Sequence, residues 1–226
     1  MWLARFYRST IGKKIIMAVT GLIGIGFVIA HMAGNLQAFV SSDKLNAYGA
    51  LLHGPLFELL WVVRVVLIVA VVLHVLMAYQ LTVRARAARP VGYEQRKPQV
   101  STWASRTMRW GGVLLLIFIV LHILHFTTGQ VDPAGWRGRL DVAGRRDVYG
   151  NLVASFRIWW VAAFYIIAMI FLGLHLYHGA WSSVRTLGYA KPSPYPLHRR
   201  IAFVVAVIVW LGFTIVPLGV IAGVIH

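Results

Sequence analysis

The sequence contains no cysteine and few acidic residues. Because cysteine is absent from all 226 residues, the chain itself supplies no disulfide, iron–sulfur ligand, thiol nucleophile or cysteine-ligated zinc. Charged residues make up 12% of the chain, about half of the roughly 25% that is usual in globular domains. Hydrophobic residues reach 59%, and the mean hydropathy is +0.74. This composition excludes an ordinary water-soluble domain and also a disordered chain, which needs low hydrophobicity.

Five apolar segments are long enough to cross a bilayer as helices, which takes about 20 residues each. The first is too long for a cleaved signal peptide and lacks a small-residue cleavage site. The loops between the segments are short, so we expect one membrane domain over residues 1–226 and no sizeable soluble domain. The five predicted spans are 15–40, 57–83, 110–129, 157–182 and 201–225.

The loops show where the chain turns. Proline-containing segments at 89–90 and 191–196 predict turns between helices. The longest remaining connection, 130–156, is rich in glycine and arginine. We expect this connection to fold over the membrane surface on the outer side.

Basic residues are divided unequally between the two sides of this bundle. One side holds most of them: Arg5, Arg8, Lys13, Lys14, Arg84, Arg86, Arg89, Arg96, Lys97, Arg106, Arg109, Arg185, Lys191, Arg199 and Arg200. The other side holds every acidic residue except Glu94. The positive-inside rule therefore predicts a multi-pass protein of the inner (cytoplasmic) membrane, with a cytoplasmic N-terminus and an outer C-terminus. The orientation of the helices in the membrane accounts for the net charge of +16. We therefore expect contact with membrane lipids and not with nucleic acid.

Six of the nine histidines lie inside predicted spans, and each of the first four spans carries at least one. Ionisable side chains are costly in a membrane interior, so they are usually functional or strongly paired. A single histidine would favour a hydrogen bond across helices, but histidines on four separate helices favour a shared ligand. The six are His31, His74, His122, His125, His175 and His178.

The spacing of these histidines from the basic helix ends predicts two levels in the membrane. Arg84 follows His74 by ten residues, and Arg185 follows His175 by ten residues. At about 1.5 Å per residue, both histidines lie roughly 15 Å from the cytoplasmic ends. They can therefore face each other at one level.

The second level lies deeper, roughly 20–25 Å from the cytoplasmic ends. It holds His31 with either His122 or His125, and depth slightly favours His125. At the first level, depth favours His175 over His178. The spare histidine of each pair lies three residues further on and stays on roughly the same helix face. It could bind a propionate, a water or a quinone oxygen.

Two neutral imidazoles across a gap are what a six-coordinate haem iron requires, because the porphyrin supplies the other four nitrogens. Zinc would need a compact set of four ligands, usually with carboxylate or thiolate support. Small surfaces along the first span could receive a macrocycle, although close helix packing explains them equally well. The glycines that provide these small surfaces are Gly21, Gly24, Gly26 and Gly34. We therefore expect an all-α membrane protein in which a four-helix bundle binds two b-type haems and a fifth helix packs beside it.

The sequence resembles the di-haem cytochrome b membrane anchor of succinate dehydrogenases (succinate:quinone oxidoreductases) and fumarate reductases, in the version with a single five-helix anchor. Similar stretches occur in order over nearly the whole chain and are weakest in the fifth span. They are His31–Gln37, Asn46–Tyr48, Trp61–Arg64 with His74, Ala88–Pro90 with Tyr93, Asp147–Tyr149 with Phe156, His175–Ser182 and Thr186–Gly188.

The resemblance implies specific axial ligands and partners. His74 and His175 would hold a proximal haem, and His31 and His122 a distal haem. The segment 118–122 is similar to the family's ligand segment, so the resemblance selects His122 where depth favours His125. A FAD-containing flavoprotein subunit and an iron–sulfur subunit would dock on the cytoplasmic face. Electrons would pass between them and menaquinone or ubiquinone, as in respiratory complex II.

Three further residues are candidates at the distal side. Arg64 is the one basic residue inside a span and could pair with a haem propionate; alternatively, it could reach the interface or pair with Glu58. Glu58 could accept protons from a quinol, although a solvated acid at a helix N-terminus is equally consistent. His53 is a further candidate for the quinone site.

Three alternative functions remain open at this point. Cytochromes b of formate dehydrogenases and hydrogenases also use histidines to connect an enzyme to quinone. A transporter or channel would need a polar pathway, and no Asp or Glu lies in the middle of a predicted span. A structural membrane subunit would use the histidines only for hydrogen bonds between helices.

Overall fold

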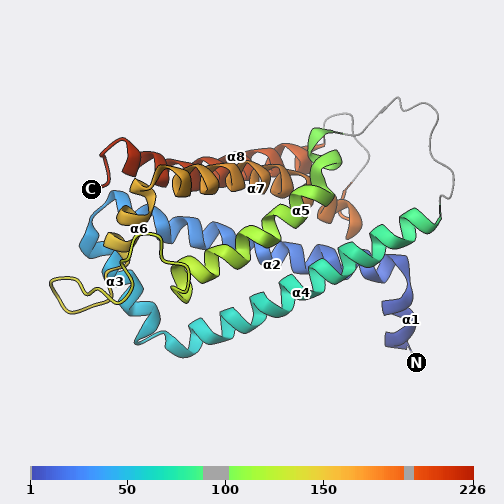
Figure 1. Ribbon diagram of the computed structural model, residues 1–226. Helices are drawn as coiled ribbons and strands as arrows, with labels where there is room; N and C mark the ends of the chain where they lie inside the picture. The colour runs from blue at the N-terminus through green and yellow to red at the C-terminus, as the bar shows by residue number, and fades with distance from the viewer. Residues whose placement is uncertain (1, 89–101, 191–195) are drawn as a thin grey trace.

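The computed structural model describes residues 2–88, 102–190 and 196–226 (Figure 1). Its five long helices are each apolar and long enough to cross a membrane, which confirms the predicted number of spans. The N- and C-termini lie at opposite ends of the bundle (Figure 1), as an odd number of spans requires. The long helices are α2 (Thr10–Leu36), α4 (Phe57–Ala87), α5 (Trp103–His122), α7 (Trp159–Thr186) and α8 (Leu197–Ile221). No β-strand occurs in these three described ranges, only an isolated bridge between Leu140 and Arg146.

The long helices extend beyond the predicted apolar segments at the end of the bundle where the N-terminus lies. α2 begins at Thr10, where Ser9 accepts a hydrogen bond from the backbone N–H of Gly12 at 2.8 Å. α4 continues through Arg84 and Arg86. Charged residues lower the hydropathy of these turns, but they do not interrupt backbone hydrogen bonding. Hydropathy therefore marks the part of each helix in lipid rather than the whole helix.

Short helices lie at the ends of the bundle. α1 (Trp2–Arg8) lies beside the N-terminus, whereas α3 (Ser42–His53) and α6 (Val148–Arg157) lie together at the opposite end (Figure 1). Two small elements interrupt the α-helical pattern, the 3-10 helix η1 (Gln37–Phe39) and the π-helix η2 (Ile123–Thr127). The sequence analysis predicted none of these elements, because they are short and lack a long apolar run.

The long helices pack in an order that leaves α4 at one edge. α7 contacts α8 and α5, and α2 contacts α4, α7 and α8. Close approach of α2 and α8 requires Gly212, because a Cβ at that position would collide with the sulfur of Met32. Val62, Ile68 and Val72 on α4 are exposed, as expected for side chains that face lipid. The buried hydrophobic clusters therefore lie mainly among α2, α6 (Val148–Arg157), α7 and α8, and α4 packs against α2.

Residues 128–147 form an irregular segment that is tied to α3 at the end of the bundle. Arg145 binds the carboxylates of Asp43 and Asp141 at 2.8 Å and 2.7 Å. Asn46 on α3 donates to Asp147 at 3.1 Å. The connection expected over 130–156 is thus partly helical, because its last third forms α6. The turns expected at 89–90 and 191–196 lie outside the described residues, apart from Pro196, which precedes α8.

Candidate functional site

His74 on α4 and His175 on α7 lie next to each other, with ring centroids 6.1 Å apart and ring planes at 55°. Nδ1 of His74 lies 3.1 Å from the backbone carbonyl of Met17 on α2. A carbonyl only accepts, so Nδ1 carries the proton and donates it, which leaves Nε2 with a free lone pair. Thr20 lies 3.3 Å from the same nitrogen. Nδ1 of His175 is buried and has no hydrogen-bond partner among the residues that the structure describes.

His31 on α2 and His122 on α5 form a second pair, with ring centroids 5.8 Å apart and ring planes at 76°. Each ring stacks on the phenylalanine four residues before it, at 5.3 Å for Phe27 and 5.7 Å for Phe118. Asn35 donates to the backbone carbonyl of His31 at 2.8 Å, and the same amide nitrogen lies 3.4 Å from Nε2 of His31. Packing thus restricts both rings.

The two pairs occupy two levels along the bundle. His74 lies beside Gly21, since a Cβ on that glycine would be 3.2 Å from Cε1 of His74. His31 follows Gly21 by ten residues on the same helix, which places the second pair about 15 Å further along α2. The two rings of a pair are in contact but share no hydrogen bond in the described residues. The four side chains come from four different helices: His31 from α2, His74 from α4, His122 from α5 and His175 from α7.

The two spare histidines have different surroundings. His125 lies in the π-helix η2 and is buried, and both its ring nitrogens contact protein groups. Nδ1 lies 2.9 Å from the hydroxyl of Tyr165 and Nε2 lies 3.0 Å from the hydroxyl of Ser155. His178 packs edge-on against Trp181 at 5.2 Å, and its Nδ1 is buried without a partner in the described ranges. His125 therefore has no nitrogen free for a ligand, whereas His178 has one.

Arg64 and Glu58 do not form an ion pair. The guanidinium of Arg64 lies 5.1 Å from the ring of Trp61, and the side chain is half-buried. Glu58 is exposed at the start of α4. No salt bridge involves either residue in the part of the chain that the structure describes. The expectation that Arg64 could pair with Glu58 is therefore not met.

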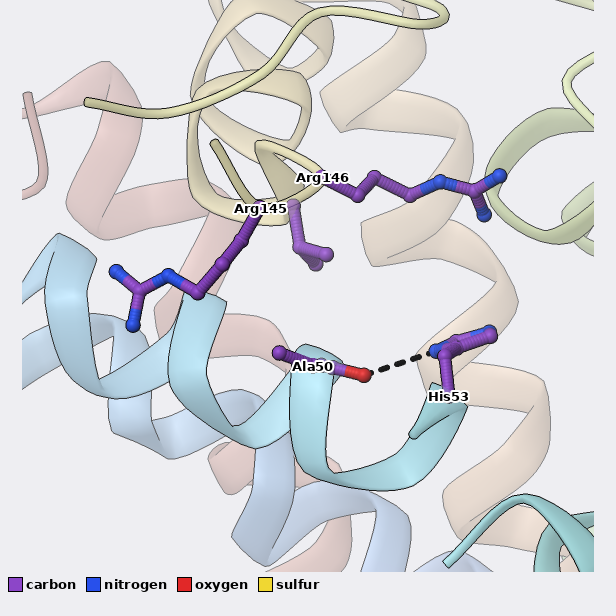
Figure 2. Close-up of a pocket in the computed structure, with 6 residues that line it drawn as sticks. Ala50, His53, Arg145 and Arg146 are labelled. Atoms are coloured by element: carbon purple, nitrogen blue, oxygen red, sulfur yellow. Dashed lines mark hydrogen bonds between the residues drawn. The ribbon is translucent and has the colours of Figure 1, made fainter. Parts of the chain in front are cut away.

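His53 lines a shallow hollow of about 270 Å³ at the end of α3, together with Gly49, Ala50, Arg145, Arg146 and Val148. Its Nδ1 lies 2.9 Å from the carbonyl of Gly49. Figure 2 shows Arg145 directed away from His53, whereas Arg146 extends over the same side of the hollow. His53 and Glu58 share no hydrogen bond or ion pair among the described residues, so the structure does not gather them into one site.

Several stretches that carry the resemblance perform a structural task. Asn46 donates to Asp147 at 3.1 Å and accepts from the backbone N–H of Tyr149 at 2.9 Å. A Cβ on Gly34 would be 2.8 Å from the ring of Tyr48. These contacts hold α3 against α2 and α6. The segment around Tyr93 lies outside the described residues.

The spacing within each histidine pair can be compared with that of two imidazoles bound to one metal. No group of three His, Asp or Glu side chains in the described ranges comes close enough to hold a metal ion. Two imidazoles on one metal, with bonds of about 2 Å to each nitrogen, would have ring centroids roughly 6 Å apart. The observed 5.8 Å and 6.1 Å agree with this spacing. A Cβ on Gly24 or Gly26 would meet nothing within 4 Å, so α2 leaves open surface between the two levels.

The sequence analysis missed Tyr165 and Ser155, which contact His125, and Asn151, which accepts a hydrogen bond from Ser155. The one available signal was a tyrosine in the apolar run of α7, ten residues before His175. Ser155 and Asn151 lie on α6, which carries no apolar span. Comparison with protein-family models, curated proteins and solved structures found no match.

Proposed function

We propose that this chain is a di-haem cytochrome b that serves as the membrane anchor and electron-transfer subunit of a succinate:quinone oxidoreductase. The observation that carries the proposal is the presence of two histidine pairs at two levels, each joining two membrane helices. Within the pairs, the ring centroids are 5.8 Å and 6.1 Å apart. Each pair supplies two imidazoles, the number that a six-coordinate haem iron takes from a protein.

His74 and His175 would hold the proximal haem, and His31 and His122 the distal haem. We assign His122 and not His125, because both nitrogens of His125 contact Tyr165 and Ser155. Bound haem would supply one-electron redox chemistry, with iron alternating between its ferrous and ferric forms. The chain positions the ligands, excludes water and provides a low dielectric around them.

The backbone and the aromatic side chains orient the ligands. Met17 accepts the Nδ1 proton of His74, so Nε2 of His74 is available to bind iron. Phe27 and Phe118 stack on the rings of His31 and His122 and restrict their rotation. Outer contacts of this kind are as important to a metal site as the ligands themselves.

The first pair lies nearer the end of the bundle where the N-terminus and most basic residues are found. We propose that this end is cytoplasmic and receives the iron–sulfur subunit, with the FAD-containing flavoprotein bound to it. Lys14 and Arg185 are exposed there and line a hollow between α2 and α7. Positive charge on this face would attract an acidic partner surface.

Quinone would react at the opposite end, near the second pair. Menaquinone and ubiquinone are both possible substrates, with Glu58 as a candidate proton acceptor and His53 as a candidate quinone contact. Arg64 has no carboxylate partner among the described residues, so a haem propionate would compensate its charge. His178 retains an unpartnered Nδ1 and is the candidate for a further contact to the proximal haem.

The decisive experiment is the reduced-minus-oxidised visible spectrum of the protein purified from membranes with ample haem, with haem quantified per chain. We expect two b-type haems per chain. Fewer than one haem per chain would contradict the proposal and favour a structural role for the histidines.

Partner identity requires a separate measurement. Mass spectrometry of the intact complex, extracted in mild detergent, should show a flavoprotein and an iron–sulfur subunit, and succinate should reduce the haem. Two haems with co-purifying formate dehydrogenase or hydrogenase subunits would retain the cytochrome assignment and contradict the succinate assignment.

A further inference from the structure

A chain of hydrogen bonds runs from His122 to the end of the bundle that carries α3 and α6. Tyr165 on α7 lies between the two histidines of α5 and η2, 3.4 Å from Nδ1 of His122 and 2.9 Å from Nδ1 of His125. Nε2 of His125 lies 3.0 Å from Ser155 on α6. Ser155 donates to the side-chain oxygen of Asn151 at 3.3 Å. Five side chains from four elements, α5, η2, α6 and α7, thus form one continuous network.

The protons in this network have one consistent direction. Ser155 gives its single proton to Asn151, so its oxygen accepts from Nε2–H of His125. Neutral His125 then has a lone pair on Nδ1, which accepts from the hydroxyl of Tyr165. The Tyr165 oxygen in turn accepts from Nδ1–H of His122. The opposite direction would protonate His122 at Nε2 and prevent iron from binding there.

His125 belongs to the π-helix η2. His122 and His125 are three residues apart and both contact Tyr165, so the two rings lie on the same side of this helix. Here the backbone N–H of Thr128 bonds to the carbonyl of Ile123, a five-residue step at 2.9 Å. A π-turn changes the angular position of the residues that follow it and often occurs at functional sites.

The middle of the network is buried, whereas His122 and Asn151 at its two ends are half-buried. Ser155 and His125 are buried, at 0% and 6% exposure. Phe126 and Phe156 pack around the ring of Tyr165, with centroids 5.7 Å and 5.1 Å away. With water excluded, the hydroxyl of Tyr165 depends on the two histidines for its hydrogen bonds.

We infer that Tyr165 is a positioning residue for the distal haem ligand, supported by His125, Ser155 and Asn151. Its oxygen selects the tautomer of His122 that binds iron through Nε2. By accepting the Nδ1 proton, it also increases the electron density on the imidazole, which favours ferric iron. This inference rests on the proposed function and assigns His125 a supporting role in place of a ligand role.

The test is the midpoint potential of each haem in Tyr165→Phe, measured by redox titration of the visible spectrum. We expect both haems to be retained. At a fixed potential, the reduced-to-oxidised ratio of the distal haem should rise by up to about tenfold, or about 59 mV for one electron. The proximal haem should not change. Tyr177→Phe is the matched control, since Tyr177 contacts Arg199 and not a ligand histidine.

Two substitutions of His125 separate positioning from general packing. His125→Gln keeps an acceptor for Tyr165 and should leave the distal potential near its wild-type value. His125→Leu removes that acceptor and should shift the potential in the same direction as Tyr165→Phe. An unchanged distal potential in both Tyr165→Phe and His125→Leu, with two haems bound, would overturn the inference but not the proposed function. A wild-type protein without haem would overturn the proposed function itself.

Discussion

At the scale of single residues, the groups that contact each ring nitrogen distinguish His74 and His122 from His125. His74 donates through Nδ1 to a backbone carbonyl, and His122 meets a tyrosine hydroxyl. When Nδ1 donates in this way, Nε2 of the neutral ring keeps a lone pair that can bind a metal. His125 is engaged at both nitrogens. A histidine in a membrane is therefore better interpreted from its two hydrogen-bond partners than from its depth alone.

Alanine substitutions in each pair test the ligand assignment. His175→Ala should reduce the haem content from two to one per chain, because the proximal iron loses one of its two axial ligands. His178→Ala, the matched control three residues away, should retain both haems. Haem quantification of the purified variants gives the answer. If His178→Ala lost a haem and His175→Ala retained both haems, His178 and not His175 would be the proximal ligand.

The distal pair allows the same comparison. His122→Ala should retain only the proximal haem, whereas His125→Ala should retain both haems with an altered distal potential. His125→Ala also leaves Tyr165 and Ser155 without their buried partner, at a cost of about 1–3 kcal/mol in stability. Thermal unfolding should therefore be measured with the spectrum. Retention of two haems in His122→Ala would contradict the assignment.

At the scale of elements, α2 contributes a small surface beside the first histidine pair. A Cβ on Gly21 would be 3.2 Å from Cε1 of His74, whereas a Cβ on Gly24 would meet nothing within 4 Å. Overpacking of this kind typically costs about 1–3 kcal/mol. The space next to the ring of His74 is therefore set by α2 as well as by α4.

Valine substitutions at the two glycines test this role of α2. Gly21→Val should displace the ring of His74 and lower the proximal haem content at least twofold, with the distal haem retained. Gly24→Val adds the same side chain where a Cβ meets nothing within 4 Å, so a loss of haem there would report a macrocycle on that surface and not a collision with His74. Equal haem content in both variants and in the wild type would contradict a role for Gly21.

The segment 128–147 is held by an ionic cluster that should respond to acid. Hydrogen bonding to Arg145 lowers the pKa of Asp141 below its ordinary 3.8, and Arg145 also binds Asp43 at 2.8 Å. Because the fold favours the carboxylate, the contribution of the cluster is complete above pH 3.8. It is lost as the pH falls through the lower pKa of the folded protein.

Limited proteolysis of residues 132–147 at successive pH values measures this effect. Cleavage should remain slow at pH 5–7 and accelerate below about pH 4, with an acid-resistant protease used throughout. Asp141→Asn should be cleaved faster at neutral pH and should depend less on pH. A wild-type segment whose protection stays constant from pH 6 to pH 3 would show that the cluster does not hold it.

At the scale of the whole molecule, the odd number of spans places the two termini on opposite sides, and the charge distribution predicts which side is cytoplasmic. The chain has no cysteine, so single introduced cysteines can report the orientation without background. Ala87 at the end of α4 and Ala143 in the segment after α5 are both exposed. These two sites lie at opposite ends of the bundle and form a matched pair.

Labelling of intact spheroplasts with a membrane-impermeant maleimide measures the orientation. Ala143→Cys should react in intact spheroplasts, and Ala87→Cys should react only after the membrane is permeabilised. The difference in labelling should be at least tenfold. The reverse pattern would place the N-terminus outside and would contradict docking of the iron–sulfur subunit on the proposed face.

Apolar length and composition determined the membrane class and the five spans, because lipid allows only segments whose backbone is satisfied internally. The histidines were also visible in the sequence as ionisable residues in apolar runs. Their separation into two pairs, with ring centroids 5.8 Å and 6.1 Å apart, depends on helix packing. Depth along each helix limited the possible partners, but rotation about the helix axis does not follow from residue spacing alone.

Tertiary structure alone decided the role of His125. Counting along an ideal α-helix places it on the face of His122, and depth even favoured it as the partner of His31. Tyr165 and Ser155, from two other helices, engage both its nitrogens. Apolar content along the chain is a local property and can be read from the sequence. Hydrogen-bond partners of a buried ring come from distant segments, and only the packed helices bring them together.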